Sequence, residues 1–515
     1  MKTFTPVRRG LLATVVLGAL APSAGAATPP SDTQAGVTPA WGCPDTERPV
    51  LDPTSPRFLA GDLGAYTSSS QTTVNCFAWQ TFVALQWPVD SRWPQDPDRA
   101  GEPDRQFQAA GWGVPVDPRS DDSRPRVWET FKPAQAIFLP GGETPSAWGV
   151  LPDPSAACRG GAATASGRRL DSHAKLPGAA TLARLDAAVL NPDETDEVVG
   201  GWLTDQAGEL VWYERLVSRA EFAYIVDDDN RLYRSARQAA VANNTDGQHP
   251  QGLSLPAGQA PGDEVQPWQQ RGAMEIKAAW RNLDDHPELW PRYRVAQAWL
   301  TDPETGECEQ AVMGLVGFHF ILKSEHFPNF LWATFEHIDN VPTPGAGYAH
   351  PHGYSFHDPQ CEAAEPARDC TPNQPRVKCD QSGHCTPQYP ESEPVQVTRQ
   401  YPIPTSDTAP TLQLNLAMQE MIAEATGGRS VFQYYQLVNT LWAQSPVPPY
   451  TEPGGTVPLK VTSLTSGGNQ PVANATLETY VQDKTCTECH AGATIAPGKG
   501  LASDFSFLFS LAEDD

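Results

Sequence analysis

The sequence predicts an α+β protein, in which an antiparallel sheet with covering helices is followed by a small helical lobe. Between residues 200 and 340, apolar and polar residues alternate in several short stretches, as expected for strands with one buried face. Short connections between these stretches favour an antiparallel β-meander. The predicted strands are residues 210–216, 274–280, 293–300, 311–322 and 330–338, with a shorter one at residues 136–139.

The first 26 residues have the pattern of a secretory signal peptide. Lys2, Arg8 and Arg9 form a positive start, residues 11–20 are apolar, and Ala24-Gly25-Ala26 is a small-residue cleavage site. No cysteine directly follows the apolar run and no later run is long enough to cross a bilayer, so neither a lipid anchor nor a membrane span is expected. We expect general secretion to the periplasm or the medium, with twin-arginine export as the alternative.

Caps and apolar spacing predict the helices. Asn75 is expected to cap a helix that ends before Pro88, and Ser218 with Glu221 resembles a capping box at the start of another. Gly427 is expected to end a helix that covers residues 411–425. The remaining predicted helices are residues 430–441, one that starts at Asn474 and delivers Cys486, and a last one around residues 505–511.

Composition shifts divide the chain into five predicted segments. The 51 prolines and 41 glycines among 39% hydrophobic residues indicate an ordered but loop-rich protein. Residues 341–410 hold 13 of these prolines, too many for a core segment. The segments are a signal peptide (1–26), an extended leader (27–74), an α+β domain (75–340), a Pro/Cys-rich excursion (341–410) and a helical C-terminal lobe (411–515).

Eight cysteines predict disulfide bonds. Their number is even and an exported chain meets an oxidising compartment, which favours disulfides over thiols. A zinc site in the excursion is the alternative, but the excursion has no paired Cys-x-x-Cys. The eight are Cys43, Cys76, Cys158, Cys308, Cys361, Cys370, Cys379 and Cys385.

The best-defined chemical motif is Cys486-Thr487-Glu488-Cys489-His490. It fits the Cys-x-x-Cys-His pattern of covalent haem c attachment. Cys486 and Cys489 are expected to bind the two vinyl groups of one haem, with His490 as the proximal iron ligand. The alternative is a redox or zinc half-site beside a surface histidine. The sequence therefore predicts a cytochrome-like C-terminal lobe.

The ligand on the other side of the iron is not determined by the motif. Only 25 residues follow His490, and none of them is methionine or histidine. Met418 and Met421 are candidate distal ligands, because they share one face of a predicted helix. An open distal position is the third alternative, and histidines are candidates either for the distal position or for a second metal site. These histidines are His319, His337, His350, His352 and His357.

Two of these histidines, His319 and His337, lie on strands that are joined by one loop. They are expected on one sheet face if the numbers of two directly paired residues on these strands add up to an even number. Glu336 would then lie on the opposite face. Glu275 and Lys277 are interpreted as part of a cross-strand ion pair rather than as an acid/base pair.

Four blocks of the chain resemble a bacterial family of large, secreted, mono-haem c-type cytochromes. The blocks are residues 75–88, 274–281, 314–342 and 485–491, within a resemblance that covers about half of the chain. The resemblance implies a role only for Cys486, Cys489 and His490, which carry the haem motif.

Charge and motifs restrict the function. The formal charge of −25 becomes −28 when the three cations of the signal peptide are removed, which disfavours nucleic acid and favours a partner with a basic docking surface. The predicted function is electron transfer with a redox partner protein or enzyme. The alternatives are a haem enzyme of the peroxidase or oxygenase type and a non-redox binding protein with a structural haem. Phosphate-binding and nucleophile-elbow motifs are not found in the sequence.

Overall fold

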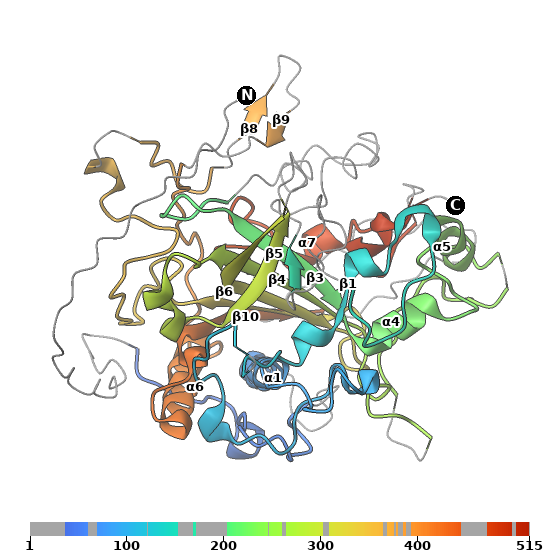
Figure 1. Ribbon diagram of the computed structural model, residues 1–515, viewed down its shortest axis with the longest axis horizontal. Helices are drawn as coiled ribbons and strands as arrows, with labels where there is room; N and C mark the ends of the chain where they lie inside the picture. The colour runs from blue at the N-terminus through green and yellow to red at the C-terminus, as the bar shows by residue number, and fades with distance from the viewer. Residues whose placement is uncertain are drawn as a thin grey trace, which may run out of the picture.

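A mixed sheet of eight strands forms the centre of the protein (Figure 1). All of its pairings are antiparallel except the one between β2 and β5, so the predicted α+β class with an antiparallel sheet is confirmed. The computed structural model describes residues 37–59, 70–120, 122–152, 168–170, 203–245, 247–259, 264–301, 308–363, 368–374, 377–379, 385–387, 393–443, 471–496 and 501–513. The predicted signal peptide lies outside these residues.

The strands run in the order β1-β3-β4-β6, after which the sheet divides into β5-β2 and β7-β10. A separate two-stranded sheet consists of β8 and β9. The eight strands are β1 (Lys132–Pro133), β2 (Arg168–Leu170), β3 (Val211–Val217), β4 (Met274–Asn282), β5 (Val295–Thr301), β6 (Cys308–Leu322), β7 (Leu331–His337) and β10 (Tyr435–Trp442). The small sheet pairs β8 (Val377–Cys379) with β9 (Cys385–Pro387).

The length of β6 explains why the sheet divides. One edge of this 15-residue strand pairs with β4, and the other edge pairs first with β5 and then with β7. Two seven-residue strands therefore fit end to end along one edge. The expected meander is corrected at this point, because β4 and β5 are consecutive in the chain but lie on opposite edges of β6.

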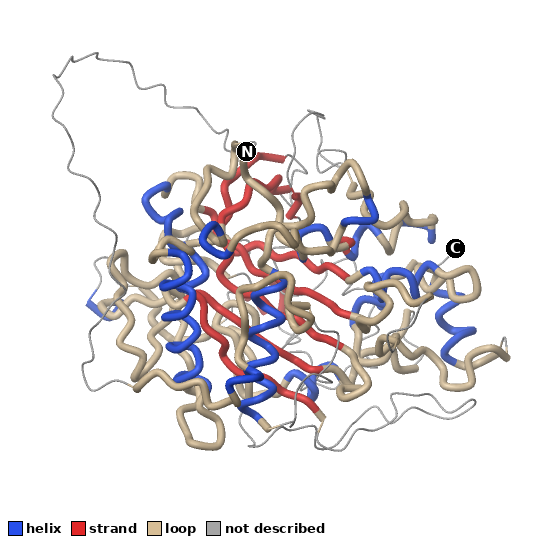
Figure 2. Tube along the Cα trace, turned by 90° about the horizontal axis from the view of Figure 1, so that it is seen from below, coloured by secondary structure: helices blue, strands red, loops and turns tan. Residues whose placement is uncertain are grey.

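Two long helices cover one face of the sheet, α1 (Gln71–Leu85) and α6 (Thr411–Thr426). Figure 2 shows both in front of the strands. Every residue of α1 is buried, and Phe82 stacks on Phe335 of β7 with ring centroids 4.3 Å apart. Ser70, not Asn75, caps α1: the side chain of Ser70 accepts a hydrogen bond from the Thr73 N–H, so the helix starts five residues earlier than predicted.

Smaller helices complete the described part of the chain. α6 ends where Gly427 adopts a left-handed conformation with φ 63°, as predicted. The predicted helix after Ser218 is α4 (Arg219–Val226), although the Ser218 side chain makes no cap. The other helices are α5 (Ser235–Ala242), α7 (Cys486–His490) and short 3₁₀ turns that include η6 (Ala134–Ala136), η11 (Val431–Tyr434) and η12 (Phe507–Leu511). None of the described helices is both long and apolar enough to cross a membrane.

Three local predictions are wrong. Residues 136–139 lie in and after the turn η6, not in a strand. The predicted helix over residues 430–441 is instead η11 followed by β10, because pairing with β7 overrides the helical spacing of its apolar residues. Residues 474–482 form turns rather than a helix. The segment 411–443 therefore joins the central sheet, and the structure does not show it as part of a separate helical lobe.

Disulfide bonds fasten two loops. Cys43 is bonded to Cys76 on α1, and Cys361 is bonded to Cys370 within the Pro/Cys-rich excursion, which confirms the prediction for these four residues. Cys308 is also disulfide-bonded. The backbone of β8 and β9 pairs residues 379 and 385 directly. Cys158 lies outside the described residues.

Replacement of Phe82 by alanine should destabilise the fold by about 3–5 kcal/mol, because it leaves a cavity between α1 and the sheet. Urea unfolding of the mature protein measures this difference. The matched control is Val150→Ala, since Val150 is 45% exposed and its truncation should change the free energy of unfolding by less than about 0.5 kcal/mol. Equal effects of the two substitutions would contradict this account of the core.

Candidate haem-attachment site

The haem motif forms α7, which lies on the face of the sheet opposite α1 and α6 (Figure 1). Side chains alternate along β7: Phe335 contacts Phe82 and Trp79 of α1, whereas Trp332 points to the other face. The ring of His490 lies against Trp332, with centroids 4.6 Å apart, and against Phe507 at 5.0 Å. The sheet therefore separates α7 from the two long helices.

A backbone hydrogen bond determines which nitrogen of His490 carries the proton. Nδ1 lies 2.8 Å from the carbonyl oxygen of Phe505. Because a carbonyl oxygen only accepts, Nδ1 must donate, and in the neutral ring the lone pair is then on Nε2. Metal-binding histidines are commonly oriented by such a bond from the nitrogen that does not bind the metal.

The positions of the two motif cysteines fit covalent attachment of a haem. Cys486 and Cys489 are both partly exposed, and neither is in a disulfide bond. On a helical turn, residues three apart lie on the same side, so both thiols lie on one side of α7. Together with the Nε2 lone pair of His490, this donor set fits a haem c.

The turn that holds His490 is itself anchored in the core. Asp504 and Phe505 both adopt left-handed backbone conformations, with φ 54° and 68°, which are rare for residues other than glycine. The carboxylate of Asp504 forms a buried ion pair with Lys323 and accepts a hydrogen bond from the Leu255 N–H. These contacts offset the cost of the unusual conformation and fix the direction of the Phe505 carbonyl.

Sequence reasoning did not identify Lys323 and Asp504 as site residues. They are 181 positions apart, and neither belongs to a motif. Trp332 was likewise not expected beside the haem motif. Only their tertiary contacts reveal their roles.

Two glutamates lie near the same turn, Glu221, which is fully buried, and Glu275, which is partly buried. Burial raises the pKa of Glu275 on β4 to about 7, although hydrogen bonds with Ser506 and Glu221 lower it. The pKa of Glu221 on α4 is well above its ordinary value, because of burial and the adjacent charge of Glu275. Burial therefore favours the protonated form of both carboxyl groups.

The histidine candidates are dispersed. In the observed register His319 pairs with Thr334, and these two numbers add up to an odd number. His319 and His337 therefore lie on opposite faces of the sheet, so the condition for a shared face is not met. Glu336 shares the face of His319. His319 Nε2 lies 3.1 Å from the carboxylate of Glu478 and 3.3 Å from the hydroxyl of Thr334.

His337 has a structural environment. It is fully buried and stacks on Tyr293 with centroids 3.8 Å apart. Burial lowers its pKa to about 4, so the ring is neutral at pH 7. Its Nε2–H donates to the Arg292 carbonyl and its Nδ1 accepts from the Asp339 N–H. Both nitrogens are therefore used in hydrogen bonds within the core.

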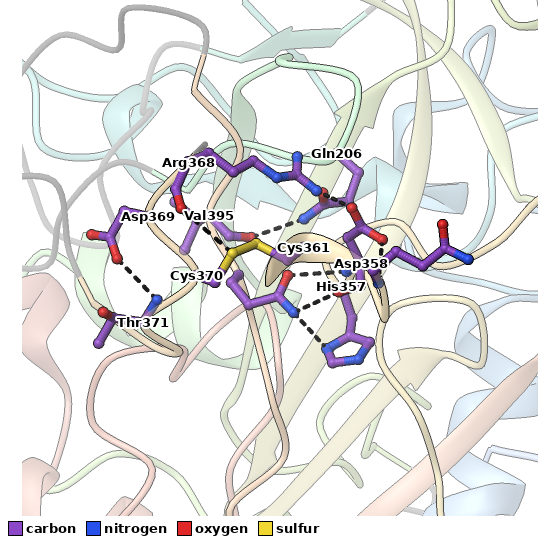
Figure 3. The surroundings of a disulfide bond; sticks show 11 residues. Gln206, His357, Asp358, Cys361, Arg368, Asp369, Cys370, Thr371 and Val395 are labelled. Carbon is purple, nitrogen blue, oxygen red and sulfur yellow. Dashed lines mark hydrogen bonds and ion pairs between the residues drawn. A yellow bond between two sulfur atoms is a disulfide. The ribbon is translucent and has the colours of Figure 1, made fainter. Parts of the chain in front are cut away.

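The three loop histidines do not converge. His350 lies 2.9 Å from Asp339, and His352 is exposed. His357 Nδ1 donates to the Val397 carbonyl. Figure 3 shows His357 in the surroundings of the Cys361–Cys370 disulfide. Among the described residues, no group of three or more histidines, cysteines and carboxylates could hold a metal ion.

The methionine candidates lie away from His490. Met418 is fully buried on α6 and Met421 is partly buried against the same core. Asn415, one turn earlier, exchanges two hydrogen bonds with the backbone of Leu437 on β10, which fixes α6 on the α1 side of the sheet. The structure therefore does not bring these methionines to α7.

Comparisons of the chain with protein-family models, with curated proteins and with solved structures find no match. Its residues and their geometry are therefore the basis for assigning the site.

Replacement of Glu275 by glutamine should reduce the loss of stability between pH 5 and pH 8. Glu275 has a folded-state pKa of about 7, above the value near 4.3 of an unfolded chain, so the folded protein binds more protons in this range and its stability falls as the pH rises. Glutamine does not titrate, and the difference should be roughly 1–3 kcal/mol in urea unfolding at the two pH values. The control is Glu288→Gln on the surface. If the E275Q protein shows the same pH dependence as the unmodified chain, the assignment fails.

Proposed function

We propose that this chain is an extracytoplasmic mono-haem c-type cytochrome that transfers electrons. The observation that supports it most is the helical Cys-x-x-Cys-His motif, in which the proton on Nδ1 of His490 is held by the Phe505 carbonyl. The two described disulfides agree with an oxidising compartment, and the resemblance to secreted mono-haem cytochromes agrees with the motif.

Each motif residue has a distinct task. The thiols of Cys486 and Cys489 would hold the haem covalently, and Nε2 of His490 would bind its iron. Phe505, anchored through Asp504 and Lys323, keeps the imidazole oriented. When bound, haem supplies a one-electron redox centre.

Electron transfer is favoured over haem catalysis for two reasons. Cys486, Cys489 and His490 are all partly exposed, so α7 lies near the surface, where a partner protein can approach a haem edge. His319 shares its sheet face with Trp332, which His490 contacts, and we favour it as the sixth ligand. The net charge of −25 favours a partner with a basic docking surface.

Replacement of both Cys486 and Cys489 by serine should abolish covalent haem, because no thioether can form. Haem staining after denaturing electrophoresis of protein exported by a host that matures cytochromes c measures this. The matched control replaces Cys361 and Cys370 by serine, which removes a disulfide remote from the motif and should retain covalent haem. Covalent haem in the C486S/C489S protein would disprove the assignment.

The optical spectrum of the reduced holoprotein tests the electron-transfer function. A low-spin spectrum that carbon monoxide does not change is expected, since both axial positions are then filled. The His319→Gln protein should bind carbon monoxide, whereas the Met418→Leu protein should not, because Met418 lies on the other face of the sheet. High-spin iron that binds carbon monoxide in the unmodified chain would instead indicate a haem enzyme.

A further inference from the structure

A cavity of about 100 Å³ opens to solvent at a place remote from α7. Its walls come from residues 111–116, residues 122–126 and residues 293–295, with Val431 of η11. The adjacent Arg294 N–H donates to the hydroxyl of Tyr435, whose ring lies beside Phe82 of α1. The cavity is therefore on the α1 side of the sheet, and the sheet separates it from His490.

Three arginines line this cavity, and one of them has no acidic partner among the described residues. Arg124 pairs with Asp104 at 2.8 Å, and Arg294 pairs with Glu129 at 2.7 Å. Arg126 makes no such ion pair, and its Nε is buried without a hydrogen bond. Its guanidinium lies over the ring of Phe432, 5.5 Å from the centroid.

The charges around the cavity do not balance. Glu129 is shared by Arg294 and Arg168, and Arg168 also pairs with Glu214 at 2.6 Å. Four arginines thus face three carboxylates, which leaves one positive charge in excess. Asp122 also lines the opening, but it is exposed, so solvent screens its charge.

The excess positive charge affects the pKa of Arg126. Burial and the positive charges of Arg294 and Arg124 lower its pKa to about 9, although Glu129 acts in the other direction. An anion in the cavity would relieve this repulsion by placing a negative charge beside the guanidinium groups that line it. A positive cavity is a local exception in a chain with a net charge of −25.

The remaining lining limits the size and character of the anion. About 100 Å³ corresponds to roughly three water molecules at about 30 Å³ each, so a ligand has only a few heavy atoms. Apolar side chains surround the arginines, and Val116 is 42% exposed at the opening. They include Phe107, Val114, Val116, Val295 and Val431. A carboxylate with a short aliphatic tail matches both parts of the lining.

We propose that this cavity is a binding site for a small aliphatic monocarboxylate, whose carboxylate binds Arg126 and whose tail contacts the valines at the opening. The proposal does not depend on the haem assignment, because none of the residues involved belongs to the α7 side of the sheet.

Titration of propionate into the full mature protein tests the site, with propionamide as the neutral analogue and chloride and phosphate as competing anions. Saturable binding of propionate without binding of propionamide is expected. Arg126→Gln should weaken propionate binding by about tenfold or more, since a charge-assisted hydrogen bond is lost. The matched control is Arg92→Gln, since Arg92 is a largely exposed arginine paired with Asp90 and should not affect binding.

Two further measurements separate binding from a structural role. Without ligand, the Arg126→Gln protein should melt at the same temperature as the unmodified chain or higher, because a cation without an ion pair, whose Nε is buried without a hydrogen bond, is removed. Val116→Glu places a competing carboxylate at the exposed opening and should also weaken propionate binding. The proposal is overturned if neither substitution weakens binding, if propionamide binds equally well, if only chloride or phosphate binds, or if Arg126→Gln lowers the melting temperature.

Discussion

The rest of the structure depends on β6. Its 15 residues pair with three other strands, and its alternating side chains define the two faces of the sheet. Phe318 faces α1, where it packs against Phe82 and Trp128, while His319 and Ile321 face the opposite side. A shift of one residue in this register would exchange the residues on the two faces. Because the packed aromatic side chains under α1 fix the register, they also determine which residues lie on the α7 side.

Buried polar contacts attach the C-terminal segment to the second face. The side chain of Asn474 donates to the Phe335 carbonyl and to Thr334, and the Ala475 N–H donates to Glu336. Further along, Lys323 pairs with Asp504. Such contacts contribute less to stability than to specificity, because a buried charge or amide tolerates few alternative partners. They define where the turn after α7 lies, and hence where His490 points.

The two candidate sites differ in the charged residues that surround them, which are acidic near α7 and basic at the cavity. Near α7, Asp504 pairs with Lys323, and burial raises the pKa values of Glu221 and Glu275, which favours the neutral forms of these two glutamates. On the α1 side, arginine remains charged even when it is buried, so an excess of arginine favours the binding of an anion. The sheet between them keeps these opposite environments apart.

The sequence alone determined the α+β class, the positions of β3 to β7, α1 and α6, and the motif at Cys486, Cys489 and His490. Local spacing and a contiguous motif carry this information without knowledge of distant residues. Tertiary structure decided that residues 435–442 are a strand, that His319 and His337 face apart, and that Met418 is separated from α7. It also placed the Phe505 carbonyl on His490 and left Arg126 without an acidic partner among the described residues. These outcomes depend on register and on contacts between residues far apart in the chain, which no local pattern encodes.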